Sequence, residues 1–449
     1  MGRIFGKNGI RGLAITEITC ELAMQIGRAA AKIMASPNGK TKILVGRDVR
    51  HSSYAIEAAV CAGLCSAGAD AELLGEVPTP ALAWHIKNSG AQGGIMITAA
   101  HTGAEYSGIK LFSSYGYRLG EDSEEDIERL LLDNPDEIEP VQLKRYGWIT
   151  RNEYALEDYK KHILEAAPAD LCGLKIAIDC ANGSTAFTAE DIFTELGAEV
   201  LMLGDTPDGQ NINFGGSTKI DALMDFVVKN KCDCGIAFDG SGERCLAVDE
   251  NGCLVDGDVI IAACARYMKE QGTLRNNTIL VTQANNLGLI RFARSNDIAT
   301  SAAPTGERNM MRRMLECGFS IGGDPLGSVI FPDDMPSFDG QLTGIRLLEA
   351  MKSQAEKMSN LAEIIEKTPQ VMFSVPIAKR HREVWKNNRA ITGLIDEFEN
   401  VLGDEGRIIV REIGKEAVIR IRIEGRDFTA INTMALQIAE VIKEELSEE

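Results

Sequence analysis

A chain of 449 residues is too long for one compact hydrophobic core, so its length predicts two to four domains. Its 47 basic and 66 acidic side chains leave a formal charge of −19, which argues against nucleic-acid binding and against a surface drawn to anionic lipid. An anionic small molecule could still bind in a locally basic pocket. The eleven cysteines lack zinc-type spacing, so we expect reduced core thiols. No signal-peptide-like start or membrane-spanning run of about 20 apolar residues is found, which predicts a cytoplasmic protein without membrane insertion.

The first 150 residues alternate between helical and strand periodicity, as repeated strand–helix–strand units do. We expect a helix at 21–35, strands at 42–45, 71–77 and 93–99, a helix capped by Ser52 and another helix after Pro80. This alternation predicts a mostly parallel sheet covered on both faces. The carboxyl end of the strand at 93–99 is then a place where α/β sheets bind ligands.

The rest of the chain repeats this pattern and then changes. A second unit is expected from residue 154, with strands at 175–179 and 234–239, and a third from residue 256, with strands at 278–282 and 318–322. In the last 80 residues, 407–411 and 417–423 alternate like antiparallel strands, and 428–446 has the pattern of an amphipathic helix. We therefore expect three related α/β units followed by an α+β unit.

Residues 95–112 carry the most informative motif. They read Ile-Met-Ile-Thr-Ala-Ala-His-Thr-Gly-Ala-Glu-Tyr-Ser-Gly-Ile-Lys-Leu-Phe, an apolar strand that runs into a short polar loop. The segment resembles the catalytic loop of the α-D-phosphohexomutases, Thr-Ala-Ser-His-Asn-Pro followed by Asn-Gly-Ile-Lys. Ala100 stands at the position of the serine that carries the phosphate. Further matching segments are 5–12, 46–50, 179–183, 207–218 and 237–252.

The resemblance covers essentially the whole chain and is strongest to the bacterial phosphoglucosamine mutase branch of that family. It implies a four-domain α/β architecture, with three related α/β domains and a C-terminal α+β domain around a central cleft. The implied domains are 1–153, 154–255, 256–370 and 371–449. Such enzymes move a phosphate between the 1- and 6-positions of a hexose through a phosphoserine, and a magnesium ion offsets charge on the transferred group.

The nucleophile loop is the first of four implied stations of the active site. The methyl group of Ala100 cannot accept phosphate, so the ordinary relay is blocked unless another hydroxyl replaces the serine. Thr98, Thr102 and Ser107 are the nearby hydroxyls, but each lies away from the required position, and about 1 Å of misplacement already costs about 10²-fold in rate. His101, Lys110 and Arg11 match catalytic positions of the family. Each could equally be structural, as a loop-bracing histidine, a solvated lysine and a turn arginine; Lys7 and Asn8 replace the Thr-Asp of the family upstream of Arg11.

The metal loop of the family reads Asp-Gly-Asp-Gly-Asp-Arg, and here it is Asp239-Gly-Ser-Gly-Glu-Arg244. A hard cation such as magnesium prefers several oxygen ligands. Ser241 replaces one carboxylate, and Glu243 lengthens another. We therefore expect a weakened magnesium site at Asp239, Ser241 and Glu243. The alternative is a glycine-rich turn held by an ion pair of Arg244.

The sugar loop and the phosphate loop also depart from the family pattern. In the sugar loop, Asp324 replaces a glutamate and Ser328 a histidine that could transfer protons, whereas the upstream Arg308 is retained. In the phosphate loop, Arg422 is retained, but Glu424 would repel a phosphate that Arg426 could bind. The alternative for the phosphate loop is an exposed hairpin turn with an internal Glu-Arg pair. The implied phosphate-binding residues are Arg422, Arg426 and Arg244.

The changes fall on the four stations, while the strand and helix patterns stay clear. We interpret the chain as a phosphohexomutase homologue that has lost mutase activity and acts by binding, as a sugar-phosphate sensor or as a regulatory subunit. Expected partners are a phosphorylated sugar, a second copy of the chain or an active mutase paralogue. The alternative is an active mutase that converts a hexose or hexosamine 6-phosphate to the 1-phosphate with a substitute nucleophile.

Overall fold

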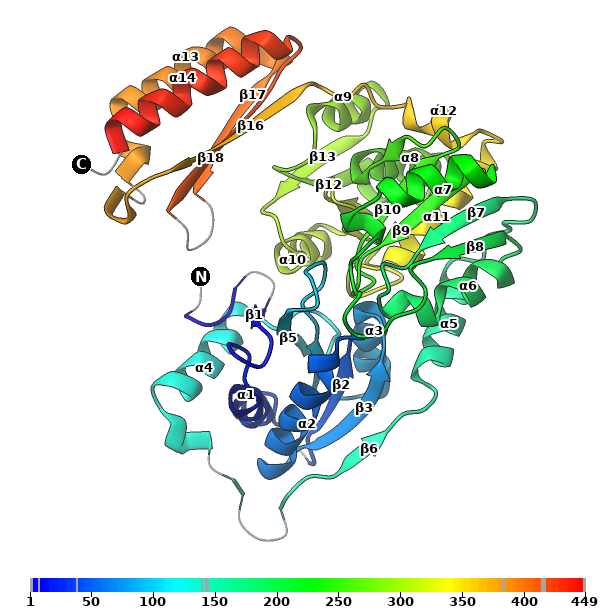
Figure 1. Ribbon diagram of the computed structural model, residues 1–449, viewed down its shortest axis with the longest axis vertical. Helices are drawn as coiled ribbons and strands as arrows, with labels where there is room; N and C mark the ends of the chain where they lie inside the picture. Colours follow the sequence, from blue (N-terminus) through cyan, green and yellow to red (C-terminus); the bar gives the residue numbers. More distant parts are fainter. Residues whose placement is uncertain are drawn as a thin grey trace. The chain divides into compact units, whose positions relative to one another are not determined.

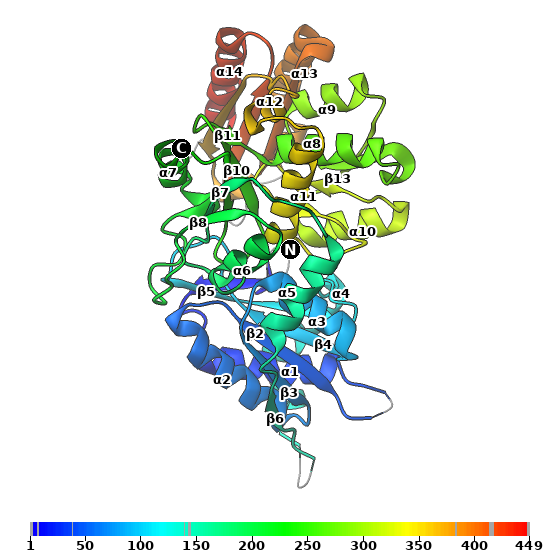
Figure 2. The same ribbon diagram turned by 90° about the vertical axis from the view of Figure 1, so that its right-hand side faces the viewer.

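The computed structural model describes residues 3–6, 9–37, 39–138, 140–141, 145–381, 384–412 and 417–446 (Figure 1; Figure 2). The chain divides into two compact units. The first unit consists of Met1–Ala284 and Asn296–Ile364, and the second of Asn285–Ser295 and Ile365–Glu449. Lys7 and Asn8 lie outside the described residues.

The first sheet has the strand order β1-β5-β4-β2-β3-β6. Its strands are β1 (Ile10–Leu13), β2 (Lys42–Arg47), β3 (Asp70–Glu76), β4 (Gly93–Ile97), β5 (Tyr106–Ser113) and β6 (Ile149–Arg151), and its helices are α1 (Cys20–Ile33), α2 (His51–Ser66), α3 (Thr79–Ser89) and α4 (Glu121–Leu132). The pairs β4–β2, β2–β3 and β3–β6 are parallel, but β1–β5 and β5–β4 are antiparallel. The expected mostly parallel sheet is thus a mixed one, because β4 turns directly back into β5 instead of crossing over through a helix. This turn is the loop that contains Ala100.

Helices α1 and α2 differ in how their first turns are capped. The side chain of Thr19 caps α1 by accepting a hydrogen bond from Leu22 N. The helix α2 already begins at His51, after an extended Arg50, and no side chain caps it. The predicted cap Ser52 therefore lies inside the helix, and that prediction is wrong.

The second sheet has the order β11-β10-β9-β7-β8, and the third the order β13-β12-β14-β15. The second comprises β7 (Lys175–Asp179), β8 (Glu199–Leu203), β9 (Cys234–Phe238), β10 (Cys245–Asp249) and β11 (Leu254–Val255), with α5 (Ala155–Ala166), α6 (Ala189–Glu195) and α7 (Asp221–Asn230). The third comprises β12 (Thr278–Thr282), β13 (Ala299–Ala303), β14 (Gly322–Gly323) and β15 (Val329–Ile330), with α8 (Gly257–Glu270), α10 (Glu307–Cys317), α11 (Gly340–Ser353) and α12 (Met358–Ala362). The strand expected at 318–322 is only β14, because α10 extends to Cys317 and ends in a left-handed Gly318.

The second unit contains an antiparallel sheet of order β16-β18-β17, covered by two helices (Figure 1). Its elements are β16 (Gln370–Pro376), β17 (Arg407–Glu412), β18 (Val418–Glu424), α9 (Leu287–Ser295), α13 (Arg389–Leu402) and α14 (Phe428–Leu446). Ile419, Ile421 and Ile423 alternate along β18 and are fully buried in the core of this unit. The expected antiparallel strands and C-terminal helix are thus confirmed. Short 3₁₀ helices complete the two units: η1 (Pro135–Ile138), η2 (Ser184–Phe187), η3 (Gly216–Thr218), η4 (Arg275–Asn277), η5 (Lys379–His381), η6 (Val384–Asn387) and η7 (Gly403–Glu405).

The first three sheets lie within the residue ranges expected for domains, and the fourth begins one residue before its range, at Gln370; the domain boundaries themselves stay a proposal. All eleven cysteines are free. Six are buried, but Cys172 and Cys253 are exposed, so the expectation of core thiols is wrong for these two. Within the described part of the chain, no helix has the length and apolar character needed to cross a membrane.

A buried polar network joins α5 to α11 in the first unit. Tyr159 Oη donates to Asp339 Oδ2 over 2.8 Å and accepts from Gln341 Nε2 over 3.2 Å. The other oxygen of Asp339 caps α11 by accepting from Leu342 N. Burial raises the pKa of Asp339 to about 6, against an ordinary value of 3.8, even though these hydrogen bonds act in the opposite direction.

The raised pKa of Asp339 predicts a pH dependence of stability. The folded state prefers the protonated carboxyl, so this contribution to the free energy of unfolding is complete below about pH 4 and is lost as the pH rises through about 6. We expect the difference in unfolding free energy between the native chain and Asp339→Asn to shift in this window and to stay constant above it. Urea unfolding at a series of pH values measures it. A difference that does not change between pH 4 and pH 7 would contradict the assignment.

Candidate functional site

Arg50 holds the loop between β4 and β5. Its fully buried guanidinium pairs with Asp48 over 2.9 Å and donates to four backbone carbonyls of the loop. These are the carbonyls of Ala100, Thr102, Gly103 and Tyr106. A loop at the end of a strand leaves such carbonyls without strand partners, and the planar guanidinium satisfies them together. The loop conformation therefore depends on a side chain from another part of the chain.

Ala100 occupies the strained point of this loop. Its φ of +51° lies in the left-handed region, which is uncommon for a residue other than glycine. Its N–H donates to Thr98 Oγ1 over 2.9 Å, and its carbonyl accepts from Arg50 and Asn213. The loop is thus fully formed around a methyl group.

The three neighbouring hydroxyls differ in access. Thr98 is buried and its hydroxyl donates to Asp48 Oδ2 over 2.7 Å, while Ser107 is fully buried within β5. Thr102 is half-buried, and its hydroxyl donates to the Ala99 carbonyl over 2.8 Å. Only Thr102, among these three, combines partial exposure with a hydroxyl in the loop.

Asn213 connects the loop of Ala100 to the metal loop at 239–244. Its side-chain amide donates to the carbonyls of Ala100 and Thr102, each over 2.8 Å, and its side-chain oxygen accepts from Gly240 N over 2.8 Å. Arg50 and Asn213 lie in the segments 46–50 and 207–218, but the sequence predicted no role for either residue. Their place in these two matching segments was the available signal.

The metal loop satisfies its polar groups internally. Asp239 Oδ1 accepts from Glu243 N and Arg244 N over 2.9 and 3.1 Å. The Ser241 hydroxyl lies 2.9 Å from Asp239 Oδ2 and 2.6 Å from Glu243 Oε2, and its one proton serves one of these acceptors at a time. All three predicted metal residues are buried and adjacent.

Lys110 lies in β5, and its side chain contacts the metal loop. Its ammonium contacts both carboxylate oxygens of Glu243, with 2.6 Å between Nζ and Oε1, and both side chains are almost completely buried. Burial alone would raise the pKa of Glu243, but the Lys110 charge holds it below its usual range. Burial and the Glu243 charge raise the pKa of Asp239.

The residues of the metal loop do not fit a magnesium ion. Magnesium requires close octahedral coordination by oxygen atoms, whereas one carboxylate is bound by an ammonium and the other by backbone N–H groups. The described residues contain no group of three or more carboxylate, histidine or cysteine side chains suited to a metal ion. The alternative expected from sequence, a turn held by an ion pair of Arg244, is not found: among the described residues Arg244 forms no ion pair, and Glu243 pairs with Lys110.

His101, Arg11 and Arg244 lie around these two loops. Burial lowers the pKa of His101 to about 3, and the charges of Arg244 and Arg11 act in the same direction, so the imidazole is neutral near pH 7. Burial lowers the pKa of Arg11 while the nearby Glu243 opposes the shift. Within the described residues, Arg11 Nε is buried without a hydrogen-bond partner. The structure therefore brings together the predicted Arg11, His101 and Arg244.

The sugar loop, which contains Asp324 and Ser328, lies against the metal loop. Asp324 Oδ1 accepts from Leu326 N and Ser328 N within its own turn, and burial raises its pKa although Arg244 opposes the shift. The turn is fastened to the metal loop by the hydrogen bond from Cys245 N to the Gly327 carbonyl.

Arg308, the third predicted residue of the sugar site, contacts helix α4 instead of the sugar loop. It forms ion pairs with Glu124 and Glu121 of α4 at 2.6 and 3.5 Å. No hydrogen bond or ion pair joins Arg308 to Asp324 or Ser328 among the described residues. The structure thus brings Asp324 and Ser328 together without their third predicted partner.

The phosphate loop belongs to the second unit. Glu424 is fully buried, and it accepts from Arg407 at 3.1 and 3.0 Å, from Leu287 N at 2.9 Å and pairs with Arg422 at 3.4 Å. Arg426 is exposed and pairs with Glu405 over 3.0 Å. The loop joins β18 to α14, so the expected hairpin turn is wrong, but a Glu-Arg pair within the loop is present as Glu424 and Arg422.

The charges of this loop are paired within the second unit. The carboxylate of Glu424 neutralises Arg422, one of the predicted phosphate ligands, and Arg426 reaches Glu405. The third predicted ligand, Arg244, belongs to the first unit.

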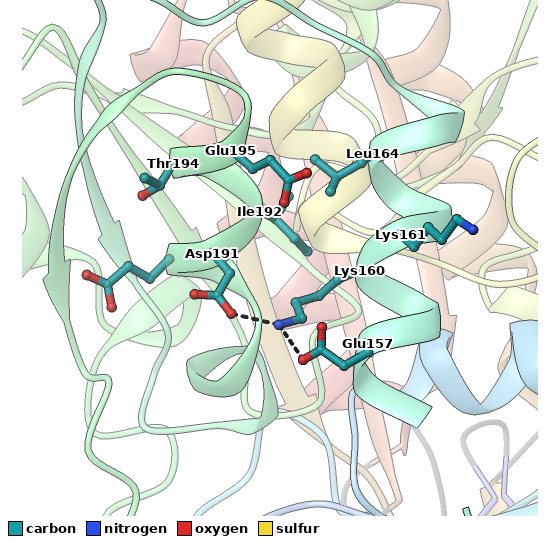
Figure 3. A pocket seen from close by; sticks show the side chains of 9 residues that line it. Glu157, Lys160, Lys161, Leu164, Asp191, Ile192, Thr194 and Glu195 are labelled. Carbon is teal, nitrogen blue, oxygen red and sulfur yellow. Dashed lines mark hydrogen bonds and ion pairs between the residues drawn. The ribbon is translucent and has the colours of Figure 1, made fainter. Parts of the chain in front are cut away.

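A separate groove of about 520 Å³ lies between α5 and α6 (Figure 3). Lys160 bridges its walls through ion pairs with Glu157 and Asp191 at 2.6 and 2.7 Å. Glu190 and Glu195 add further negative charge to the lining. None of the predicted site residues lines this groove, and its excess of carboxylates would repel a phosphate.

The role of Arg50 can be tested by removing its charge. Arg50→Met would leave Asp48 buried without its charged partner and would remove one donor from each of four carbonyls, although those of Ala100 and Thr102 would keep Asn213 as a donor. We expect the unfolding free energy to fall by about 3–5 kcal/mol. The matched control is Arg129→Met, which removes an exposed pair with Asp126 and should cost less than about 1 kcal/mol. Urea unfolding followed by circular dichroism measures both. Equal losses in the two variants would contradict the role of Arg50.

Neutralising Glu424 should make the phosphate loop more positively charged, so that it binds an anion such as phosphate. Glu424→Gln leaves Arg407 and Arg422 without their shared carboxylate, so we expect a lower thermal midpoint that inorganic phosphate partly restores. Glu405→Gln, which removes only an exposed pair, should change neither quantity. Thermal denaturation with and without phosphate tests this. A phosphate effect equal to that in the native chain would refute it.

Comparison with known proteins shows the family of the chain. Descriptions of the Phosphoglucomutase/phosphomannomutase family match the chain in four parts: alpha/beta/alpha domain I at residues 2–137, domain II at 157–252, domain III at 256–368 and the C-terminal domain at 373–441. A phosphoglucosamine mutase of Acetivibrio thermocellus is 42% identical over 448 residues, which cover 99% of this chain and all of the relative.

Solved structures have the same fold. A Phosphoglucomutase/phosphomannomutase family protein from Burkholderia thailandensis superposes with a TM-score of 0.82 at 22% identity, covering 98% of this chain and 97% of the other. An N-acetylphosphoglucosamine mutase of Aspergillus fumigatus, solved with GlcNAc-6P and magnesium, has a TM-score of 0.69 at 14% identity and covers 100% and 96%. A serine-to-alanine variant of that fungal mutase, in complex with glucose 1,6-bisphosphate, has a TM-score of 0.63 at 15% identity with the same coverage. With all four domains matched in order, the chain belongs to the phosphoglucomutase/phosphomannomutase family of phosphohexomutases.

Proposed function

We propose that this protein binds a phosphorylated hexose or hexosamine but does not pass phosphate through a residue of its own. The observation that carries the proposal is Ala100, a methyl group held in a fully formed nucleophile loop. A methyl group offers no oxygen for a phosphoryl group, and the loop hydroxyls of Thr98 and Ser107 are buried. The loop is therefore suited to contact a ligand without forming a phosphoenzyme.

The surrounding charges support binding of an anion. Arg11 and Arg244 lie near the loop, and Arg11 Nε has no hydrogen-bond partner among the described residues. A guanidinium binds phosphate in a bidentate manner. The fungal serine-to-alanine variant in complex with glucose 1,6-bisphosphate also supports a bisphosphorylated sugar as the ligand class.

The second candidate function is an active phosphohexomutase that interconverts hexosamine or hexose 6- and 1-phosphates. The comparisons by themselves favour it, since the relative at 42% identity is named a phosphoglucosamine mutase. It requires a substitute nucleophile, and the half-buried Thr102 is the accessible hydroxyl of the loop. Its hydroxyl would first have to leave the Ala99 carbonyl.

The binding role takes one of two forms. The chain either senses a sugar phosphate in the cytoplasm or serves as a regulatory subunit, as a homodimer or beside an active mutase paralogue. Its charge of −19 makes nucleic acid an unfavourable partner. Stabilisation by a sugar phosphate supports the sensor, and its absence leaves the subunit role.

Phosphoenzyme formation distinguishes the binding protein from the active mutase. After incubation with glucose 1,6-bisphosphate or glucosamine 1,6-bisphosphate and magnesium, we expect the intact mass of the chain to be unchanged and no 1-phosphate to form from the 6-phosphate. Calorimetric titration of glucose 1,6-bisphosphate should still show binding. Ala100→Ser alone should not restore turnover, because the metal, sugar and phosphate loops also differ.

Two results would contradict the binding role and support the active mutase or intact neighbouring loops. A stable phosphopeptide containing Thr98, Thr102 or Ser107, with turnover abolished by changing that residue to alanine, would establish the active mutase. Full activity of Ala100→Ser would show that the other three loops still work.

A further inference from the structure

We propose that the Lys110 ammonium is a built-in replacement for a divalent cation, which holds the metal loop in a closed form that needs no metal. This inference concerns the site of the proposed function. It rests on that function, which assigns no metal-dependent phosphoryl transfer to the metal loop. Cation binding is measured without any sugar, so failure of this inference can be told apart from failure of the proposed function.

The contact has the geometry of a cation site. Lys110 Nζ lies against both oxygens of Glu243, and the Ser241 hydroxyl lies 2.6 Å from one of them. The two charged side chains are 4% and 8% exposed, so water screens their attraction little. The ammonium thus provides, from within the chain, the positive charge that a buried carboxylate requires.

The contact also joins two parts of the first unit. Lys110 lies in β5 opposite Met96, and Glu243 follows β9 in the second sheet, 133 residues away. Backbone hydrogen bonds fix the loop from two further sides: Thr79 N donates to the Ser241 carbonyl, and Gly340 N to the Gly242 carbonyl. The loop therefore cannot open for an incoming ion without loss of buried contacts.

The surrounding charges oppose a second cation. Glu243 experiences Lys110 and Arg118, and Arg11 lies near both Glu243 and Asp239. A divalent ion beside Lys110 would add strong repulsion at short distance in a poorly screened site. The absence of a third carboxylate is a weaker explanation, because it does not account for the ammonium bound to both oxygens of Glu243.

Removal of the ammonium should therefore create a cation site. Lys110→Met keeps a side chain of similar length but leaves Asp239 and Glu243 as neighbouring buried carboxylates, whose repulsion a divalent ion would relieve. We expect the native chain to take up no stoichiometric Mn²⁺ and Lys110→Met to bind one ion at least about tenfold more tightly than the native chain. Mg²⁺ should raise the thermal midpoint of this variant alone.

Electron paramagnetic resonance of free Mn²⁺ during titration measures this uptake. Lys87→Met, which removes an exposed lysine of α3, is the matched control, and Lys110→Met with Glu243→Gln should lose the gained site. Ser241→Asp with Lys110 intact separates the two explanations: it should still exclude Mn²⁺ if the ammonium occupies the position of the ion, and it should bind Mn²⁺ if only a carboxylate is missing.

Two results would overturn the proposal. The first is stoichiometric Mn²⁺ uptake by the native chain, which needs no variant to fold. The second is a folded Lys110→Met, or Lys110→Gln where the methionine variant does not fold, that binds Mn²⁺ no better than the native chain.

Discussion

The pair of Asp48 and Arg50 is the interaction on which the site depends. A buried ion pair gains little net stability unless its remaining hydrogen-bonding groups are satisfied, and here each of them has a partner. Arg50 reaches four loop carbonyls, and Asp48 also accepts from Thr98 and Ser53. The loop can therefore keep Ala100 in the left-handed region, because the surrounding hydrogen bonds fix its backbone.

The new polar side chains at the altered positions of the site share one physical property: each has a partner inside the protein. Glu243 binds Lys110, Ser241 lies between two carboxylates, and Glu424 pairs with two arginines. Buried polar groups without partners cost stability, so these side chains are compatible with the fold of the family. The chain has the scaffold of its family and a different arrangement of charge within it.

Much of the fold could be predicted locally. The strands at 175–179 and 278–282 and the helix at 428–446 have the predicted bounds, because apolar runs and helical periodicity reflect burial within a short segment. The failures concern features set by distant contacts. Ser52 does not cap α2, since the preceding Arg50 is extended toward the loop, and the sheet is mixed because β4 and β5 form a direct turn.

The sequence by itself determined the family, most of the secondary structure and the absence of a hydroxyl at Ala100, because each of these depends on residue types and their local order. It also predicted that Arg11, His101 and Arg244 belong to one site. Only the tertiary structure decided what the remaining groups do: Lys110 meets Glu243 across 133 residues, and Arg308 turns to α4 instead of the sugar loop. The physical reason is that a buried charge takes its partner from whichever element packs against it, and packing is not encoded in the spacing of a motif.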